Sequence, residues 1–145
     1  MPDDTAVRKD QTRTFFNTVA PDYDIGGSFA YFGQRLVALV GIEQGHRVLD
    51  LASGRGAVLF PAAERVGEIG DVIGVDLADG MVEAANQEAI RRGLSARVRA
   101  MDAEHLEFAD ASFDRVVCGF GLMFFPHLDR ALACLLYTSP SPRDS

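Results

Sequence analysis

The fold of this chain is decided by the stretch Arg47-Val48-Leu49-Asp50-Leu51-Ala52-Ser53-Gly54-Arg55-Gly56. A short apolar run that carries one acid, Asp50, ends in a glycine-containing loop, and after the loop the apolar spacing becomes helical. A buried strand that leads into a helix through such a turn is the first half of a nucleotide-binding α/β unit. Glycine suits the loop because it adopts unusual backbone angles and lets a ligand approach the main chain closely.

The composition is that of one ordinary domain, or of part of one. Of the 145 residues, 48% are hydrophobic and 24% are charged, which is typical of globular proteins. No window is apolar enough to span a bilayer, and the charged start does not resemble a secretion signal. The net charge of −7 argues against a nucleic-acid partner, which would favour a basic face. Two cysteines make neither a disulfide framework nor a metal cluster, so we expect no metal and a reducing cytoplasm.

Residues 1–45 are expected to form helices and a lid segment ahead of this unit. Residues 5–20 have the spacing of a polar-to-amphipathic helix, which ends where Pro21 prevents easy continuation. A turn-rich segment with one aromatic residue, Tyr23, follows. A second helix is expected over about residues 29–40, with Gly41 at its C-terminal cap.

Residues 46–133 are expected to alternate strand and helix. We expect strands near 47–51, 71–76, 96–101 and 113–119, and helices near 57–66, 79–92 and 127–133. This alternation predicts right-handed β-α-β crossovers and a parallel sheet, and therefore the α/β class.

Two local patterns refine this expectation. Arginines alternate with apolar residues in the third strand, around Val98, which is the pattern of a sheet edge. Pro61 fits the helix near 57–66 only if that helix starts late enough to keep the proline in its opening turn.

Three aspartates, Asp50, Asp76 and Asp102, each lie at or just past the carboxyl end of an expected strand. In an open parallel sheet these ends face one crevice where ligands bind. Neighbouring strands lie about 4.8 Å apart, so the three carboxylates are expected to share one small site. Acids also follow strands by chance, as helix caps or solvated loop residues, but that alternative is weaker for three positions than for one.

Three carboxylates are a poor environment for a diphosphate. A dinucleotide site presents glycines and a helix N-terminus to the pyrophosphate, whereas Asp50 directly precedes this loop and the G-x-G-x-x-G pattern is absent. No Gly-Lys-Ser/Thr follows, which excludes a P-loop. Asp76 suits a ribose, because one carboxylate can accept from both hydroxyls. The expected ligand is a nucleoside with little negative charge and preferably a cation, and S-adenosylmethionine meets these requirements.

Four ordered segments resemble the class I S-adenosylmethionine-dependent methyltransferases. The stretch Val48 to Gly56 resembles motif I of that family, usually written D/E-x-G-x-G-x-G. The second-strand motif of the family resembles Gly74-Val75-Asp76-Leu77-Ala78-Asp79-Gly80-Met81. The family's adenine-side acid and its entry to strand four resemble Met101-Asp102-Ala103-Glu104, Phe108 and Ser112-Phe113-Asp114. Similar to the ubiquinone/menaquinone-type members are Phe15-Phe16, Ala20-Pro21-Asp22-Tyr23-Asp24 and Phe120-Gly121-Leu122. The resemblance covers about residues 10–133 and implies a Rossmann-like three-layer fold with strand order 3-2-1-4.

The chain departs from the family pattern at three positions. Ala52 stands where the first motif glycine is usual, which is tolerable if this residue has an ordinary strand-end backbone. Ala78 stands where a capping serine or threonine is common, so Asp79 is expected to cap the helix instead. Arg55 is bulkier than the usual residue and is expected to narrow the rim of the cofactor site.

The resemblance implies a cofactor site for S-adenosylmethionine. Its implied residues are Tyr23, Asp50, Ala52, Ser53, Gly54, Gly56, Asp76, Leu77, Met81, Asp102, Ala103, Gly119 and Phe120. The Ser53-Gly54 turn and Gly56 would cradle the methionine part, and Asp50 would hold the loop and the amino group. Asp76 would bind the ribose hydroxyls.

At the adenine end, Asp102 would accept from the exocyclic amine and Ala103 would contribute a backbone donor. Leu77 and Met81 would pack on the adenine, although ordinary core packing explains them equally well.

Around the sulfonium, Gly119 and Phe120 would line the floor. Tyr23 would close over the cofactor as part of a lid, with an exposed turn aromatic as the equal alternative. No general base is identified, because methyl transfer is an in-line displacement in which a base is optional.

The last residues, 134–145, depart from the family altogether. They form a Ser/Pro run that suits neither a helix nor a central strand. Cys134 to Asp144 is similar to the translation of a transposase-type sequencing adapter, with a natural disordered terminus as the alternative. If the adapter hypothesis holds, roughly a further hundred residues of a typical domain are missing, including strands five to seven of the fold.

Three functions remain open from the sequence. The chain is expected to be the cofactor-binding N-terminal part of an enzyme that methylates a small-molecule acceptor. It could instead be a fragment that binds S-adenosylmethionine without turnover. A nicotinamide-dinucleotide-binding domain is the third alternative.

Overall fold

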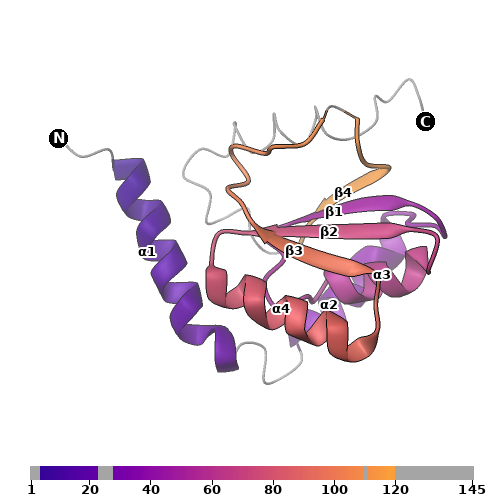
Figure 1. Cartoon of the computed structure of the whole chain (residues 1–145), viewed down its shortest axis with the longest axis horizontal. Coiled ribbons are helices and arrows are strands. Elements are labelled where there is room, and N and C mark those ends of the chain that lie inside the picture. The colour runs from indigo at the N-terminus through magenta and orange to yellow at the C-terminus, as the bar shows by residue number, and fades with distance from the viewer. Residues whose placement is uncertain (1–3, 23–27, 110, 120–145) are drawn as a thin grey trace.

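The computed structural model describes residues 4–22, 28–109 and 111–119 (Figure 1). The first helices are α1 (Asp4–Val19), the short 3-10 helix η1 (Ala20–Asp22) and α2 (Ser28–Leu39). Strands and helices then alternate as β1 (Arg47–Leu51), α3 (Leu59–Val66), β2 (Asp71–Asp76), α4 (Asp79–Arg92), β3 (Ala96–Ala100) and β4 (Arg115–Cys118). Tyr23, Phe120, the helix expected near 127–133 and the segment 134–145 lie outside the described residues.

The four strands form one parallel sheet in the order β3-β2-β1-β4. The α/β class and the strand order 3-2-1-4 are therefore confirmed. In β3, at one end of this sheet, Val98 is the one buried residue, as the alternating arginines predict. The register pairs Asp50 with Gly74 and Asp76 with Ala100, so the acids that end successive strands lie at the same edge.

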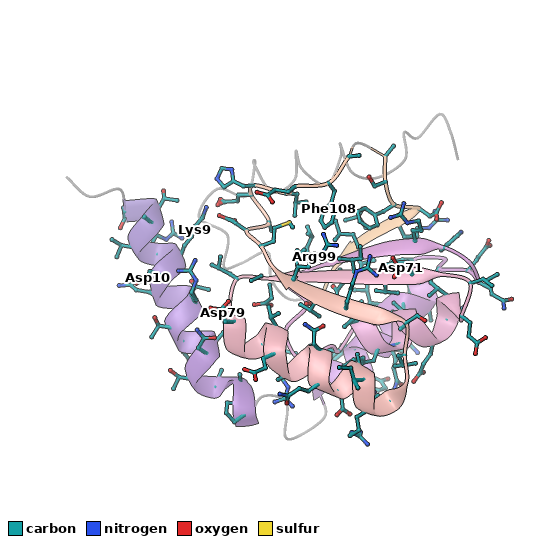
Figure 2. The ribbon with its side chains drawn as sticks, viewed as in Figure 1. Lys9, Asp10, Asp71, Asp79, Arg99 and Phe108 are labelled. Atoms are coloured by element: carbon teal, nitrogen blue, oxygen red, sulfur yellow. The ribbon has the colours of Figure 1, made fainter. Side chains whose placement is uncertain are left out.

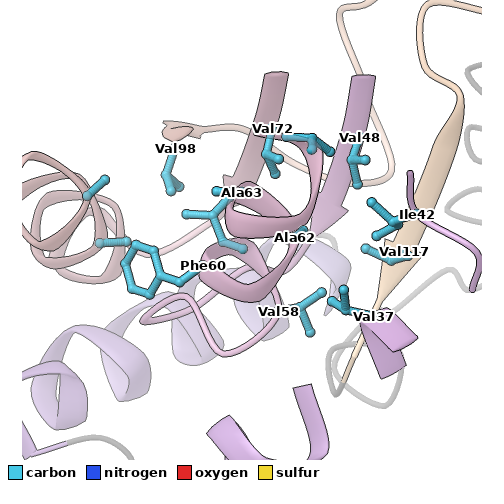
Figure 3. Close-up of a cluster of buried hydrophobic side chains, with 14 residues drawn as sticks. Val37, Ile42, Val48, Val58, Phe60, Ala62, Ala63, Val72, Val98 and Val117 are labelled. Carbon is cyan, nitrogen blue, oxygen red and sulfur yellow. The ribbon is translucent and has the colours of Figure 1, made fainter. Parts of the chain in front are cut away.

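The sheet separates two apolar clusters, because successive side chains of a strand point to opposite faces. Helices α2, α3 and α4 lie on one face, and the segment after β3 covers the other (Figure 1). The helix side is packed by a cluster that includes Val48, Val72, Val98 and Val117 from the strands and Phe60 and Ala63 from α3 (Figure 3). The other side is packed by Leu49, Leu51, Ile73, Val75, Ala103 and Phe113.

Helix α3 begins at Leu59, two residues later than expected. Pro61 is therefore its third residue and lies in the opening turn, where no intrahelical N–H is lost. Gly33 of α2 lies so close to the chain before α3 that a Cβ there would overlap the Ala57 carbonyl. The two helices can therefore pack directly against each other only because position 33 has no side chain.

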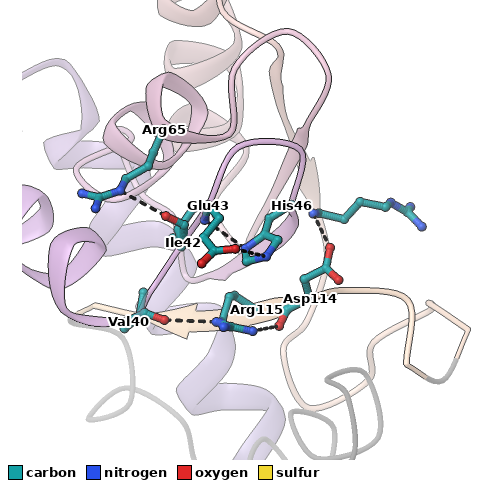
Figure 4. A network of polar contacts seen from close by, with 8 residues as sticks. Val40, Ile42, Glu43, His46, Arg65, Asp114 and Arg115 are labelled. Carbon is teal, nitrogen blue, oxygen red and sulfur yellow. Dashed lines mark hydrogen bonds and ion pairs between the residues drawn. The ribbon is translucent and has the colours of Figure 1, made fainter. Parts of the chain in front are cut away.

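A polar network holds the amino ends of β1 and β4 (Figure 4). The Arg47 N–H donates to Asp114 Oδ2 at 2.8 Å, and Arg115 Nε donates to the Val40 carbonyl at 3.1 Å. Nearby, the Glu43 N–H donates to His46 Nδ1 at 3.0 Å. These charged groups serve the loops at the edge opposite the strand-end aspartates, so they lie outside the candidate site. No helix within the described ranges is long and apolar enough to cross a bilayer.

Candidate cofactor site

A cavity of about 370 Å³ opens at the carboxyl ends of the strands, between the sheet and α1. Its volume lies in the range of roughly 300–1,000 Å³ typical of small-molecule pockets. Of the predicted site residues, those that line it are Asp50, Ala52, Ser53, Gly54, Asp76, Leu77, Met81, Asp102, Ala103 and Gly119. The structure thus brings the three strand-end aspartates to one cavity, as predicted, and Gly119 after β4 lines the same cavity.

Gly56 is the exception among the predicted residues that the structure describes, because it does not line the cavity. Its φ is +97°, and a Cβ there would overlap the Phe60 ring. Its N–H donates to the Ser53 carbonyl at 3.1 Å. Gly56 therefore shapes the turn and admits the packing of Phe60.

Asp76 joins the loop after β1 to the loop after β2. Its Oδ2 accepts from the Gly54 N–H at 2.8 Å and its Oδ1 from the Ala78 N–H at 2.9 Å. Burial raises the pKa of this carboxyl, and the backbone N–H donors oppose part of that rise. Because a carboxylate offers about four lone-pair positions, Asp76 can hold both loops and still accept from a ligand hydroxyl.

Asp50 is a buried acid whose charge is poorly satisfied by the described residues. It is 1% exposed, and no described residue donates to its Oδ2. Burial, and next the negative charge of Asp76, raise the pKa of the Asp50 carboxyl well above its ordinary value. A buried acceptor without a donor is costly, so the chemistry of this position favours a ligand that brings a cationic donor.

Ser53 adds a second unsatisfied group beside Asp50. Its Oγ is buried and accepts or donates no hydrogen bond among the described residues. The hydroxyl fits because Gly74 faces it: a Cβ on Gly74 would lie 2.7 Å from Ser53 Oγ. The Asp50 carboxylate and the Ser53 hydroxyl together fit the polar amino-acid end of S-adenosylmethionine.

Alanine is expected to be tolerated at position 52, in place of the motif glycine, if this residue has an ordinary strand-end backbone. The structure shows that it does not. Its φ is +53°, in the left-handed region. A residue with a Cβ is strained there, because the Cβ approaches the following carbonyl oxygen. The loop therefore demands a glycine-like conformation at this position and the chain meets it with alanine.

Asp102, at the other end of the cavity, already has cationic and backbone donors. Lys9 Nζ lies 2.6 Å from its Oδ2, and the Glu104 N–H donates to its Oδ1 at 3.0 Å. Burial opposes ionisation, but the Lys9 ammonium and the Glu104 N–H outweigh it, so the pKa of Asp102 is lowered. Asp102 is thus held ionised.

The expected cap of α4 is wrong. Asp79 lies in the first turn of the helix, and Ala78 at the N-cap makes no side-chain cap. Instead, Asn17 Oδ1 of α1 accepts from the Gly80 N–H at 2.6 Å. A residue more than sixty positions away in the sequence therefore supplies the acceptor that a helix N-terminus requires.

Helix α1 forms a wall of the site that the sequence did not reveal. From this helix, the residues that line the cavity are Lys9, Thr12, Arg13, Phe15 and Phe16. Lys9 and Arg13 are four residues apart, a spacing that places them on one helix face, and this was the available signal.

Two arginines connect this N-terminal part to the strand-end loops. Arg13 Nε donates to the Leu77 carbonyl at 3.3 Å. Arg55, at the cavity rim, donates through Nη1 to the Ala20 carbonyl.

Met81 fits both predicted roles, adenine packing and core packing. It lines the cavity and is also buried against Ala20 and Ala78. Within the described part of the chain, no group of three or more His, Cys, Asp or Glu residues is arranged to hold a metal ion.

The chain belongs to a known family. The family model for the methyltransferase domain matches residues 48–137. Aklanonic acid methyltransferase DauC of Streptomyces sp. (strain C5) is 43% identical over 133 residues, which cover 90% of this chain and 60% of the relative. Nocamycin O-methyltransferase of Saccharothrix syringae is 43% identical over 121 residues, 81% of this chain and 43% of the relative. The chain is therefore a member of the methyltransferase domain family, and the predicted class I S-adenosylmethionine-dependent family is confirmed.

A more distant relative and two solved structures agree with this assignment. The ubiquinone/menaquinone biosynthesis C-methyltransferase UbiE of Cupriavidus necator is 32% identical over 136 residues, 90% of this chain and 56% of the relative. A SAM-dependent methyltransferase from Aquifex aeolicus superposes with a TM-score of 0.76 at 22% identity, covering 85% of this chain and 66% of that chain. The [4+2]-cyclase SpnF superposes with a TM-score of 0.72, also at 22% identity, covering 90% of this chain and 56% of that chain. These two structures show the shared fold.

The cofactor prediction, S-adenosylmethionine, is confirmed at the level of the family. The chain spans 43–60% of the length of the three relatives named here.

Proposed function

We propose that this chain is the cofactor-binding part of an enzyme that transfers a methyl group from S-adenosylmethionine to a small-molecule acceptor. The observation that carries the proposal is the Asp50 carboxylate, buried at the cavity wall with an oxygen that no described residue satisfies. A cationic amino group beside it would replace the lost solvation, and a phosphate would not.

The amino-acid end of the cofactor is assigned to the first loop. The cofactor's amino group lies against Asp50, and its methionine part follows Ser53 and Gly54, with Ala52 beside it. Asp76 accepts from the ribose hydroxyls with the lone pairs that its two backbone donors leave available.

The adenine is assigned to the opposite end of the cavity. It packs between Leu77 and Met81, with Asp102 as the acceptor for its amine and the Ala103 N–H as a donor. The apolar lining supports this assignment, since a flat heterocycle needs such walls around a few placed polar groups. The lid role of Tyr23 and the floor role of Phe120 remain proposals.

The bound cofactor supplies an electrophilic methyl group on a sulfonium. The chain's contribution is to orient that group and to exclude water, since alignment provides much of the acceleration of an in-line displacement. Gly119 lines the cavity and, having no side chain, exposes its backbone there. A Cβ at this position would lie 3.1 Å from Val58 Cγ2. A side chain at position 119 would therefore crowd the floor on which the acceptor must approach. No general base is assigned.

The acceptor is proposed to be a small organic molecule. The relatives named above include an O-methyltransferase and a C-methyltransferase, so both oxygen and carbon acceptors belong in the assay panel. The net charge of −7 supports the absence of a nucleic-acid partner. The two cysteines of the sequence are too few for a disulfide framework, which supports a reducing cytoplasm as the compartment.

Calorimetric titration tests the cofactor assignment. The ligands are S-adenosylmethionine, S-adenosylhomocysteine and NAD, and the variants are Asp76→Ala and, as control, Asp71→Ala. Asp71 begins the same strand at the opposite edge of the sheet, where it pairs with Arg97. We expect Asp76→Ala to weaken binding of both adenosyl ligands at least tenfold and Asp71→Ala to leave it unchanged. Tighter binding of NAD, or equal affinity of the two variants, contradicts the assignment.

Turnover separates the enzyme from a fragment that only binds. The fragment remains a second candidate, because the chain spans about half the length of its curated relatives. Transfer of labelled methyl to any member of the acceptor panel supports the enzyme. Cofactor binding without transfer to any acceptor, while a full-length relative assayed in parallel turns over, supports the fragment.

A further inference from the structure

Lys9 is a cation held inside the cavity by two acids. Its Nζ lies 2.6 Å from Asp102 Oδ2 and 2.7 Å from Glu104 Oε2. Its side chain is 15% exposed, and that of Glu104 is 1% exposed. In Figure 2 Lys9 points from α1 toward the body of the protein, whereas Asp10, the next residue, points away.

Glu104 keeps the ammonium in this position. A buried carboxylate is strongly destabilised when its counter-charge is removed, so Glu104 requires Lys9 whether or not a ligand occupies the cavity. One turn further along the same face of α1, Arg13 is bonded to the Leu77 carbonyl, which holds the helix in place. Lys9 is therefore a fixed part of the cavity wall and does not swing freely into solvent.

The consequence concerns the hydrogen-bonding character of this end of the cavity. An ionised carboxylate only accepts, and an ammonium only donates. If Asp102 were alone, this part of the cavity wall would accept a hydrogen bond from an amino group and repel a carbonyl oxygen. With Lys9 beside it, the wall offers an acceptor and a donor at adjacent points.

We propose that Lys9 is a specificity-determining residue that makes this purine subsite tolerant of both 6-amino and 6-oxo purines. A 6-amino group donates to Asp102 while Lys9 keeps its contact with Glu104, whereas a 6-oxo group accepts from Lys9. The proposal deepens the proposed function and rests on its assignment of the adenine to this end of the cavity.

The test compares S-adenosylhomocysteine with S-inosylhomocysteine, which differ in the 6-substituent and in the N1 proton that accompanies the 6-oxo group. Their dissociation constants are measured by calorimetry for the wild type and for the double variant Lys9→Met/Glu104→Gln. The double variant removes the cation together with Glu104, its more deeply buried partner, and Asp102 keeps the hydrogen bond from the backbone N–H of residue 104. Lys9→Arg, which keeps a donor, is the rescue variant, and Arg8→Met, which removes a cation from the exposed face of α1, is the control for loss of a helix cation away from the cavity.

We expect the wild type to bind the two ligands within about fivefold of each other. In the double variant the preference for the 6-amino ligand should grow at least tenfold, because a buried acceptor facing a carbonyl oxygen is left unpaired. Lys9→Arg and Arg8→Met should keep the wild-type ratio. The same ratio in wild type and double variant overturns the role of Lys9 while leaving the proposed function standing. Failure of the wild type to bind either ligand overturns the proposed function and this inference together.

Discussion

Replacing Ala52 with glycine should stabilise this protein, although glycine usually weakens a folded chain. Ala52 has a φ of +53°, a conformation that costs a residue with a Cβ roughly 1–2 kcal/mol. Glycine removes that strain but adds about 0.4–1 kcal/mol of conformational entropy to the unfolded chain. The Ala52 methyl borders the cavity, so little packing is lost with it. The expected net gain in the free energy of unfolding is about 0.5–1 kcal/mol.

Two further alanines provide the controls for this measurement. Ala111 also has a positive φ, +55°, but does not line the cavity, so Ala111→Gly should stabilise the protein by a similar amount. Ala100 ends strand β3, and no left-handed φ is recorded for it, so Ala100→Gly should destabilise by about 0.5–1 kcal/mol. Urea unfolding followed by circular dichroism, with an unchanged m-value, measures all three.

The sign of the effect at position 52 decides the outcome. If Ala52→Gly lowers the unfolding midpoint as Ala100→Gly does, the strain attributed to the loop is absent. A gain for Ala111→Gly alone would show that the method detects strain but that Ala52 carries none.

Three further changes test the site and its supports. Asp50→Asn should weaken binding of S-adenosylmethionine at least tenfold and stabilise the ligand-free protein at neutral pH. Because the pKa of Asp50 is raised, the folded state keeps a proton that the unfolded state releases, so the free energy of unfolding of the wild type falls as pH rises from about 4 toward that raised pKa. Urea titrations across this range should show that the unfolding free energy of the variant depends less on pH. The same pH dependence in both proteins would contradict the assignment. Asn17→Ala should cost about 1 kcal/mol, since the Gly80 N–H loses its acceptor; thermal unfolding checks this, and an unchanged midpoint would show that the long-range cap contributes nothing. Gly56→Ala should destabilise by at least about 2 kcal/mol, because the new methyl meets Phe60 at a φ of +97°; a well-folded variant with wild-type stability would refute the packing argument.

The sheet was predictable because its information is local. Each strand is a short apolar run with turn residues at both ends, and the alternation of strand and helix implies parallel pairing. The predicted β1 and β2 bounds agree with the structure, and β4 is shorter than expected. The convergence of Asp50, Asp76 and Asp102 on one cavity follows from the same rule, since parallel strands end at one edge.

The wall that faces those acids was decided only in three dimensions. Lys9 contacts Asp102 across 93 positions of sequence, and Arg13 contacts Leu77 across 64. Helical spacing shows that α1 is a helix, but it does not say which element the helix covers, because its polar residues suit solvent and a cavity wall equally well.

The backbone of the first loop shows the same division at the scale of one residue. The sequence by itself determined that residues 52–56 form a glycine-rich turn between a strand and a helix, because local propensity suffices for that. Only the tertiary structure decided that Ala52 takes the left-handed conformation and that Asn17, in place of Asp79, caps α4. Both outcomes depend on where the ends of the sheet and α1 place their hydrogen-bonding groups, and this long-range geometry overrides local preference.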